Sequence, residues 1–140
     1  MSIQQRHIGR ERAVQALFSL EQTQPADVGQ GLEHFWNSIE DDTGRVAKLF
    51  AEELVRGVAA NRDALDEAIQ AQSENWRVER MARIDRNVLR VGAYELVHTE
   101  TPARVVINEA VEVARTFGGE SSPAFVNGIL DKLARAQGKL

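Results

Sequence analysis

Two stretches near the end of the chain, Ile107-Asn108-Glu109-Ala110 and Phe125-Val126-Asn127-Gly128-Ile129-Leu130-Asp131-Lys132, are the most informative about its fold. Apolar residues recur in both at three- and four-residue intervals, which is typical of amphipathic helices. Polar Asn108, Asn127 and Asp131 interrupt these apolar patterns. We expect them to form hydrogen bonds between helices that fix the C-terminal bundle. The two stretches therefore predict packed helices and not a catalytic site.

The same helical period runs through nearly the whole chain, and no segment shows the strict alternation of a half-buried strand. We therefore predict an all-α fold, a compact bundle of about seven helices. A chain of 140 residues, of which 43% are hydrophobic, fits one domain with its own core. The helical pattern weakens near Trp76, which predicts a boundary between two helical subdomains, about residues 1–72 and 73–140.

Helix boundaries are indicated by capping residues and glycines. Residues that stand before an apolar pattern and are expected to cap helices are Asp27, Thr43, Asp85 (or a residue just before it), Thr101 and Ser121. The acidic turn Glu40-Asp41-Asp42 is expected to close the second helix. Gly57 lies inside a helical pattern, which indicates that a neighbouring helix approaches closely there.

Composition excludes several classes of function. The chain has no cysteine, so it has neither disulfides nor a thiolate metal site, which fits a cytoplasmic protein. Its three histidines show no metal-binding spacing, and no catalytic or cofactor-binding motif occurs. No segment resembles a signal peptide or a membrane span. We therefore expect no metal, no cofactor and no enzymatic activity.

The first predicted helix, roughly residues 4–22, places Arg6 and Arg10 on the same stripe as apolar Leu17. Because arginine does not sit unpaired in a core, we expect this helix to project past the bundle and to hold both guanidinium groups over a groove. There they could bind phosphates or stack on bases, and His7 beside them could add a donor or a ring. The alternative interpretation is a solvated helix start.

Several motifs together resemble one protein family. They are Arg12-Ala13-Val14-Gln15-Ala16-Leu17-Phe18, Asp85-Arg86-Asn87-Val88-Leu89-Arg90, Tyr94-Glu95-Leu96, Ile107-Asn108-Glu109-Ala110-Val111, Phe117-Gly118 and Phe125-Val126-Asn127-Gly128-Ile129-Leu130-Asp131. In this order they resemble the NusB family of bacterial transcription antitermination factors. The resemblance covers nearly the whole chain and is weakest between residues 23 and 43.

The resemblance implies a role in RNA binding without bond chemistry. Its expected ligand is single-stranded boxA RNA of ribosomal RNA leader transcripts. In the family the arginine-rich start of the first helix contacts RNA, which corresponds here to Arg6, His7 and Arg10. Phe125 is the matching aromatic residue of the last helix, suited to stacking on an unpaired base. A core phenylalanine is the alternative at that position.

The resemblance also implies partners. The main one is NusE, which is also ribosomal protein S ten, and its expected contacts are Phe18, Glu79 and Asp85. The complex would then act on the RNA polymerase elongation complex indirectly. A homodimer is a further possibility, because the exposed side of the first helix suits either self-association or NusE.

Two other functions are compatible with a helical fold. One is the NusB-like domain of an RNA cytosine methyltransferase, but the chain carries no glycine-rich strand-to-helix segment for S-adenosylmethionine. The other is a dimerising helical interaction module that does not bind RNA.

Overall fold

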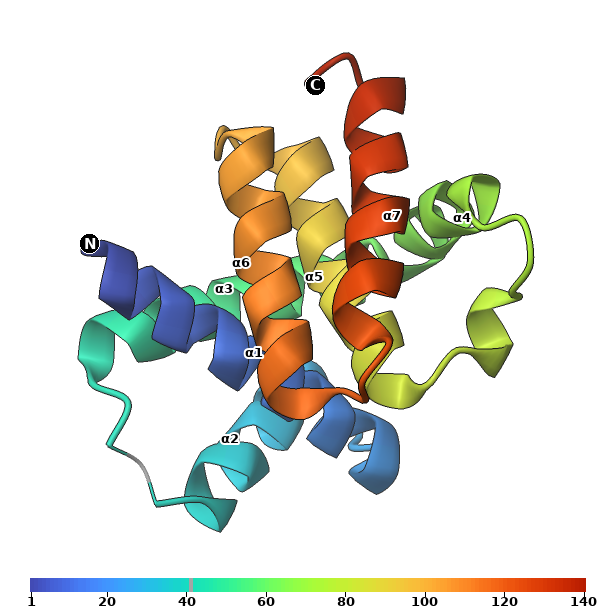
Figure 1. Ribbon diagram of the computed structural model, residues 1–140. Helices are drawn as coiled ribbons and strands as arrows, with labels where there is room; N and C mark the ends of the chain where they lie inside the picture. Colours follow the sequence, from blue (N-terminus) through green and yellow to red (C-terminus); the bar gives the residue numbers. More distant parts are fainter. Residues whose placement is uncertain (41) are drawn as a thin grey trace.

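The computed structural model describes residues 1–40 and 42–140, and all regular elements in these ranges are helices (Figure 1). The elements are α1 Ile3–Thr23, α2 Val28–Ser38, α3 Arg45–Ala60, α4 Arg62–Gln72, the short 3-10 helix η1 Val78–Arg80, α5 Arg83–His98, α6 Ala103–Phe117 and α7 Ser122–Ala136. The prediction of an all-α bundle is confirmed. Asp41 of the predicted acidic turn lies outside the described residues.

Helix α5 occupies the middle of the bundle and packs against α1, α3, α4, α6 and α7 (Figure 1). It buries Val88, Leu89 and Leu96, and all seven α-helices, so far as the chain is described, contribute buried apolar side chains to one continuous cluster. Burial of this apolar surface is the main force that stabilises the bundle. The division into subdomains near residue 72 stays a prediction.

Helix α1 crosses the bundle and packs most extensively on α3. Its buried face is built from small residues, including Ala13 and Ala16, which lets the helices approach closely. At its start, Ser2 accepts a hydrogen bond from the backbone N–H of Gln5, and the Gln5 side chain accepts one from the backbone N–H of Ser2. This reciprocal cap satisfies two backbone donors and fixes where the helix begins.

Two of the predicted helix starts are confirmed. The Asp27 side chain accepts a hydrogen bond of 2.8 Å from the backbone N–H of Gln30 at the start of α2. Ser121 is the N-cap position of α7, and Pro123 lies at the start of that helix, although the Ser121 hydroxyl makes no capping bond. Proline is favoured here because its fixed φ suits the first helical turn.

The capping roles predicted for Thr43, Asp85 and Thr101 are wrong. Thr43 Oγ1 accepts a 2.8 Å hydrogen bond from Arg12 Nε, and Gly44 is the N-cap of α3. Helix α5 begins at Arg83, which agrees with the predicted alternative of a start just before Asp85. Asp85 itself lies in the first turn, where a carboxylate interacts favourably with the helix dipole. Helix α6 begins at Ala103 after Pro102, so Thr101 stands one position too early.

The expectation that Asn108, Asn127 and Asp131 join helices is also wrong. Asn108 and Asn127 are exposed, and Asp131 accepts a hydrogen bond from Arg135 Nε within α7 at 2.9 Å. Helices α6 and α7 pack instead through apolar side chains such as Val113 and Leu130, which are buried. The three polar residues face outward, where water satisfies their hydrogen-bonding groups.

Within residues 1–40 and 42–140, no helix combines the length and the apolar character that crossing a lipid bilayer requires.

Gly57 provides a test of the helix packing. A Cβ atom at Gly57 would lie 2.2 Å from Cζ of Tyr94 on α5, which confirms the predicted close approach. We predict that Gly57→Ala lowers the free energy of unfolding by roughly 1–3 kcal/mol because the ring must move. Gly128→Ala on α7 is the matched control: its Cβ meets nothing within 4 Å.

Urea denaturation should show that Gly128→Ala raises the free energy of unfolding by up to about 1 kcal/mol, since alanine is the better helix former. Equal effects of the two substitutions would contradict the described contact between α3 and α5.

Candidate functional site

Arg6 lies on the outside of the bundle in the first turn of α1. Its side chain is exposed and forms no ion pair or hydrogen bond with another residue in the described part of the chain. His7 beside it is half-buried, with Nδ1 3.2 Å from Glu109 Oε1 and Nε2 3.5 Å from Glu11 Oε2. The His7 side chain is therefore occupied by two carboxylates, whereas the Arg6 guanidinium group is available to an external anion.

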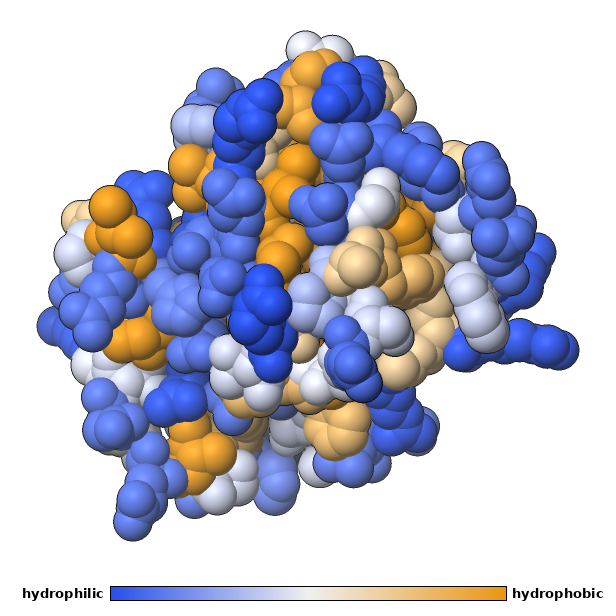
Figure 2. Space-filling model, in the orientation of Figure 1, coloured by the Kyte–Doolittle hydropathy of each residue, from blue (hydrophilic) through white to orange (hydrophobic). Residues whose placement is uncertain are grey.

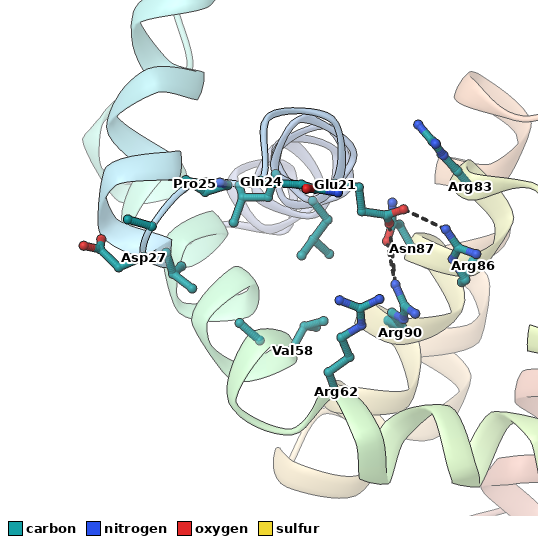
Figure 3. A pocket seen from close by; sticks show the side chains of 15 residues that line it. Glu21, Gln24, Pro25, Asp27, Val58, Arg62, Arg83, Arg86, Asn87 and Arg90 are labelled. Atoms are coloured by element: carbon teal, nitrogen blue, oxygen red, sulfur yellow. Dashed lines mark hydrogen bonds and ion pairs between the residues drawn. The ribbon is translucent and has the colours of Figure 1, made fainter. Parts of the chain in front are cut away.

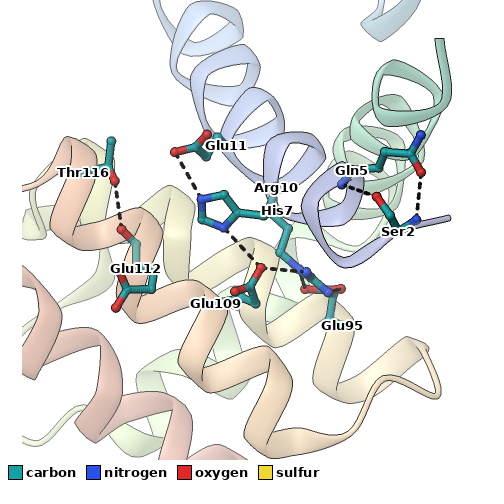
Figure 4. Close-up of polar contacts among 9 residues, drawn as sticks. All are labelled: Ser2, Gln5, His7, Arg10, Glu11, Glu95, Glu109, Glu112 and Thr116. Carbon is teal, nitrogen blue, oxygen red and sulfur yellow. Dashed lines mark hydrogen bonds and ion pairs between the residues drawn. The ribbon is translucent and has the colours of Figure 1, made fainter. Parts of the chain in front are cut away.

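Arg10 has a different environment from the predicted one. Its side chain is 3% exposed, and it pairs with the equally buried carboxylate of Glu95 on α5 (Figure 4). Arg10 Nε donates to Glu95 Oε2 at 2.8 Å, and Nη2 donates to Oε1 at 2.9 Å. Such a bidentate geometry is the strong form of the arginine–carboxylate pair. The guanidinium also lies 5.5 Å from the ring centre of Phe50.

The expectation that Arg10 projects over an open groove is therefore wrong. The helical wheel correctly placed Arg10 on the apolar stripe of α1, but the buried carboxylate that neutralises it comes from a residue 85 positions away. The described contacts give Arg10 a structural role inside the protein, and Arg6 alone projects outward. One signal of this arrangement was present in the sequence, because Glu95 lies on the inner stripe of α5 with Gly92 and Leu96.

Glu109 links this pair to the histidine. Its Oε1 accepts a hydrogen bond from Arg10 Nη1 at 3.3 Å and also contacts His7 Nδ1 (Figure 4). The resulting polar network, which consists of His7, Arg10, Glu95 and Glu109, joins α1 to α5 and α6. It holds the first turn of α1, and with it Arg6, in a defined position. This structural role of Glu95 and Glu109 was not predicted.

Phe125 lies in the first turn of α7 and is half-buried. One part of its ring packs against the core, as the alternative interpretation required. The side chain also lines a shallow groove of about 250 Å³ between α7 and the loop that follows α4. Phe125 is thus anchored in the core and accessible from the groove.

The residues predicted to bind a protein partner come from three elements. Phe18 is half-buried on α1, Glu79 is exposed on η1, and Asp85 is half-buried on α5. The N–H groups of Arg86 connect these elements: Nη2 donates to Glu21 Oε2 at 2.7 Å, and Nη1 donates to the Glu79 carbonyl at 3.3 Å. Arg86 therefore joins α5 to α1 through one ion pair and to η1 through one hydrogen bond.

Figure 3 shows Glu21 and Arg86 beside Arg90 at a cavity of about 630 Å³ formed by α1 to α5. Arg90 binds Asp66 through Nε at 2.7 Å and through Nη2 at 2.9 Å. It also lies 3.5 Å from Glu21. Of the four arginines that line this cavity, Arg86 and Arg90 are paired with carboxylates, whereas Arg62 and Arg83 form no ion pair within the described residues.

Glu79 remains negatively charged near neutral pH. A hydrogen bond with its own backbone and a second one from Arg77 lower the pKa of this exposed carboxyl below its ordinary value. An exposed carboxylate in this state is suited to a basic partner.

Comparison with known proteins identifies the family. Residues 7–135 match the sequence pattern of the NusB family. This chain belongs to the NusB family. The transcription antitermination protein NusB of Anaeromyxobacter dehalogenans is 53% identical to it over 125 residues, which covers 89% of this chain and 87% of the relative.

Solved structures agree with this assignment. T. maritima NusB is 37% identical and superposes with a TM-score of 0.81, covering 93% of this chain and 90% of the other. A NusB chain from a crystal structure of antitermination factors NusB and NusE with double-stranded RNA is 22% identical, with a TM-score of 0.83 and coverage of 96% and 99%. The latter likeness supports the fold alone. The predicted membership of the NusB family is confirmed.

The two arginines of α1 should differ in their effect on stability. We predict that Arg10→Ala lowers the free energy of unfolding by about 3–5 kcal/mol, because it leaves the buried Glu95 carboxylate without its main partner. Arg6→Ala should change it by no more than about 0.5 kcal/mol, as expected for an exposed site. Urea denaturation followed by circular dichroism measures both values. An Arg10→Ala protein as stable as the parent would refute the described pair.

Proposed function

We propose that this chain is a transcription antitermination factor that binds boxA RNA of ribosomal RNA leader transcripts together with NusE, ribosomal protein S ten. The observation that carries the proposal is the exposed Arg6, which has no partner among the described residues and is held in place by the buried network behind it. Membership of the NusB family and the fold shared with a NusB chain crystallised with NusE and RNA support it.

The RNA surface in this proposal consists of Arg6, His7 and Phe125. The net charge of the chain is −4, so long-range attraction to RNA is absent and a local cation must bind the phosphate. Arg6 supplies that cation, and Phe125 supplies a ring for stacking on an unpaired base. Arg10 acts indirectly, because its pairing with Glu95 fixes the helix that carries Arg6.

The partner surface in this proposal consists of Phe18, Glu79 and Asp85. It offers an aromatic ring together with carboxylates, a combination that suits a partner with basic and apolar side chains. NusE would add its own RNA contacts, so that the pair binds the transcript more tightly than either protein alone. The assembled complex would act in the cytoplasm on the elongating RNA polymerase, with no chemical step on the RNA.

The RNA assignment is tested by the salt dependence of binding. If the complex neutralises two or three phosphates, one through Arg6 and the others through the contacts that NusE adds, log K should fall with log salt with a slope of about −1.4 to −2. Arg6→Ala should make the slope shallower by roughly 0.7, the contribution of one phosphate on a single strand. Fluorescence anisotropy of labelled boxA RNA, with NusE present, measures this slope at several salt concentrations.

Arg56→Ala is the matched control, because Arg56 is an exposed arginine on α3. Its slope should equal that of the parent protein. The proposed contact is excluded if Arg6→Ala and Arg56→Ala give the same slope and affinity.

The partner assignment is tested by charge reversal at Glu79. We predict that Glu79→Lys weakens NusE binding by roughly 5- to 30-fold, because it replaces attraction to a basic surface by repulsion. Glu120→Lys, an exposed charge reversal between α6 and α7, should leave affinity unchanged. Isothermal titration with purified NusE measures both. Equal affinities would argue against Glu79, and light scattering on the same samples would reveal a homodimer.

A further inference from the structure

Trp76 is an exposed aromatic residue to which the proposed function assigns no task. It lies in the loop between α4 and η1, and its side chain is 57% exposed, whereas Trp36 is only 7% exposed. Burial of a large aromatic ring contributes favourably to the free energy of folding, and an exposed indole does not make this contribution. A ligand that covers the ring would recover this contribution.

The exposure of Trp76 arises in a well-anchored loop. The carbonyl of Trp76 accepts hydrogen bonds from Ser73 Oγ at 2.7 Å and from Gln70 Nε2 at 3.1 Å. The Gln70 side chain also accepts a hydrogen bond of 2.9 Å from the backbone N–H of Val78, whose side chain is buried. These hydrogen bonds hold the backbone that carries Trp76 in a preorganised position, which reduces the entropy that a ligand must overcome.

Trp76 lines the same groove as Phe125. The two aromatic residues come from different elements, the loop after α4 and the first turn of α7, and Gly128 of α7 also lines the groove. A Cβ atom at Gly128 would meet nothing within 4 Å, so the space above this residue is open. Figure 2 shows apolar side chains gathered around the first turns of α7, with hydrophilic residues surrounding them.

Lys132 supplies a cation at this groove. Its Nζ lies 3.8 Å from Glu74 Oε1, and the two side chains are 52% and 81% exposed. An ion pair this long and this exposed contributes little to stability, so Lys132 can exchange Glu74 for a phosphate at low cost. Accessible rings beside a lysine form the combination that binds single-stranded nucleic acid through stacking and phosphate contacts.

We propose that Trp76 and Phe125 together bind an unpaired base of a single-stranded RNA, and that Lys132 binds the adjoining phosphate. This inference rests on the proposed function and extends its RNA surface from Phe125 to the loop after α4. Bases in a duplex are already stacked on one another, so the groove selects single strands. We favour RNA over a protein segment as the occupant of this groove for two reasons. Lys132 supplies a positive charge for a phosphate, and the groove includes Phe125 of the proposed RNA surface.

The indole itself reports on the proposed contact. The chain has two tryptophans, and Trp36 is buried with its N–H donated to Glu52 at 2.9 Å. Unlabelled single-stranded boxA RNA, added to the complex with NusE, should therefore quench tryptophan fluorescence of the parent protein through stacking on Trp76. Trp76→Phe keeps a ring for stacking but leaves Trp36 as the only indole of this chain, so the quenching should be lost while RNA affinity is largely retained.

Affinity gives the second readout, measured by anisotropy of labelled RNA in the same complex. Trp76→Ala should bind single-stranded boxA RNA about 5- to 150-fold more weakly, the effect expected for losing one stacked base. Its binding to duplex RNA should be unchanged. Because Trp76 is exposed, urea denaturation should show parental stability for both variants.

The outcomes separate the two proposals. If the parent complex binds RNA but Trp76→Ala binds it equally well and no quenching occurs, the groove assignment is overturned and the proposed function stands. If NusE alone quenches Trp76 and RNA adds nothing, the groove binds protein and the inference is again overturned. If the parent complex does not bind boxA RNA at all, the proposed function fails and the inference fails with it.

Discussion

The buried pair between Arg10 and Glu95 is the constraint on which the arrangement of this protein depends. The side chains of Arg10 and Glu95 are 3% and 2% exposed, so both charges lose their hydration when the protein folds. Their mutual attraction offsets this desolvation free energy only if their hydrogen-bonding geometry is good. The bidentate bonds, with Glu109 as a further acceptor, meet the requirement at the junction of α1, α5 and α6. Any rotation or shift of α1 would separate the charges. The pair therefore fixes the position of α1 more strictly than apolar contacts alone would.

The functional surface follows from this constraint. With Arg10 committed to the interior, the cation available at the start of α1 is Arg6, one turn earlier and on the outside. The other end of the proposed RNA surface is built in a similar way: Phe125 is anchored in the core on one side, and Trp76 is held by hydrogen bonds to its backbone. A chain of net charge −4 can thus bind RNA through a few fixed groups, without a general positive field.

The sequence predicted the helices well because an apolar period of 3.6 residues is a local property. The close approach at Gly57 was also predicted from a local pattern. A glycine inside an apolar helical face indicates that a neighbouring helix lies too close for a larger side chain. The prediction failed for Asn108 and Asn127, because periodicity does not show which face a distant helix will cover. The wheel placed Arg10 on the correct face, but its partner Glu95 is distant in sequence, and only the folded chain brings them together. The groove at Trp76 was missed because a loop carries no periodic pattern.

A double-mutant cycle on Arg10 and Glu95 tests the central claim most directly. The free energy of unfolding would be measured by urea denaturation for the parent, Arg10→Met, Glu95→Leu and the double variant. Each single substitution leaves a buried charge without its main partner and should cost about 3–5 kcal/mol, whereas the double variant should be more stable than either single variant. Losses that simply add in the double variant would contradict the account, because they would show that the two charges do not interact in the folded protein.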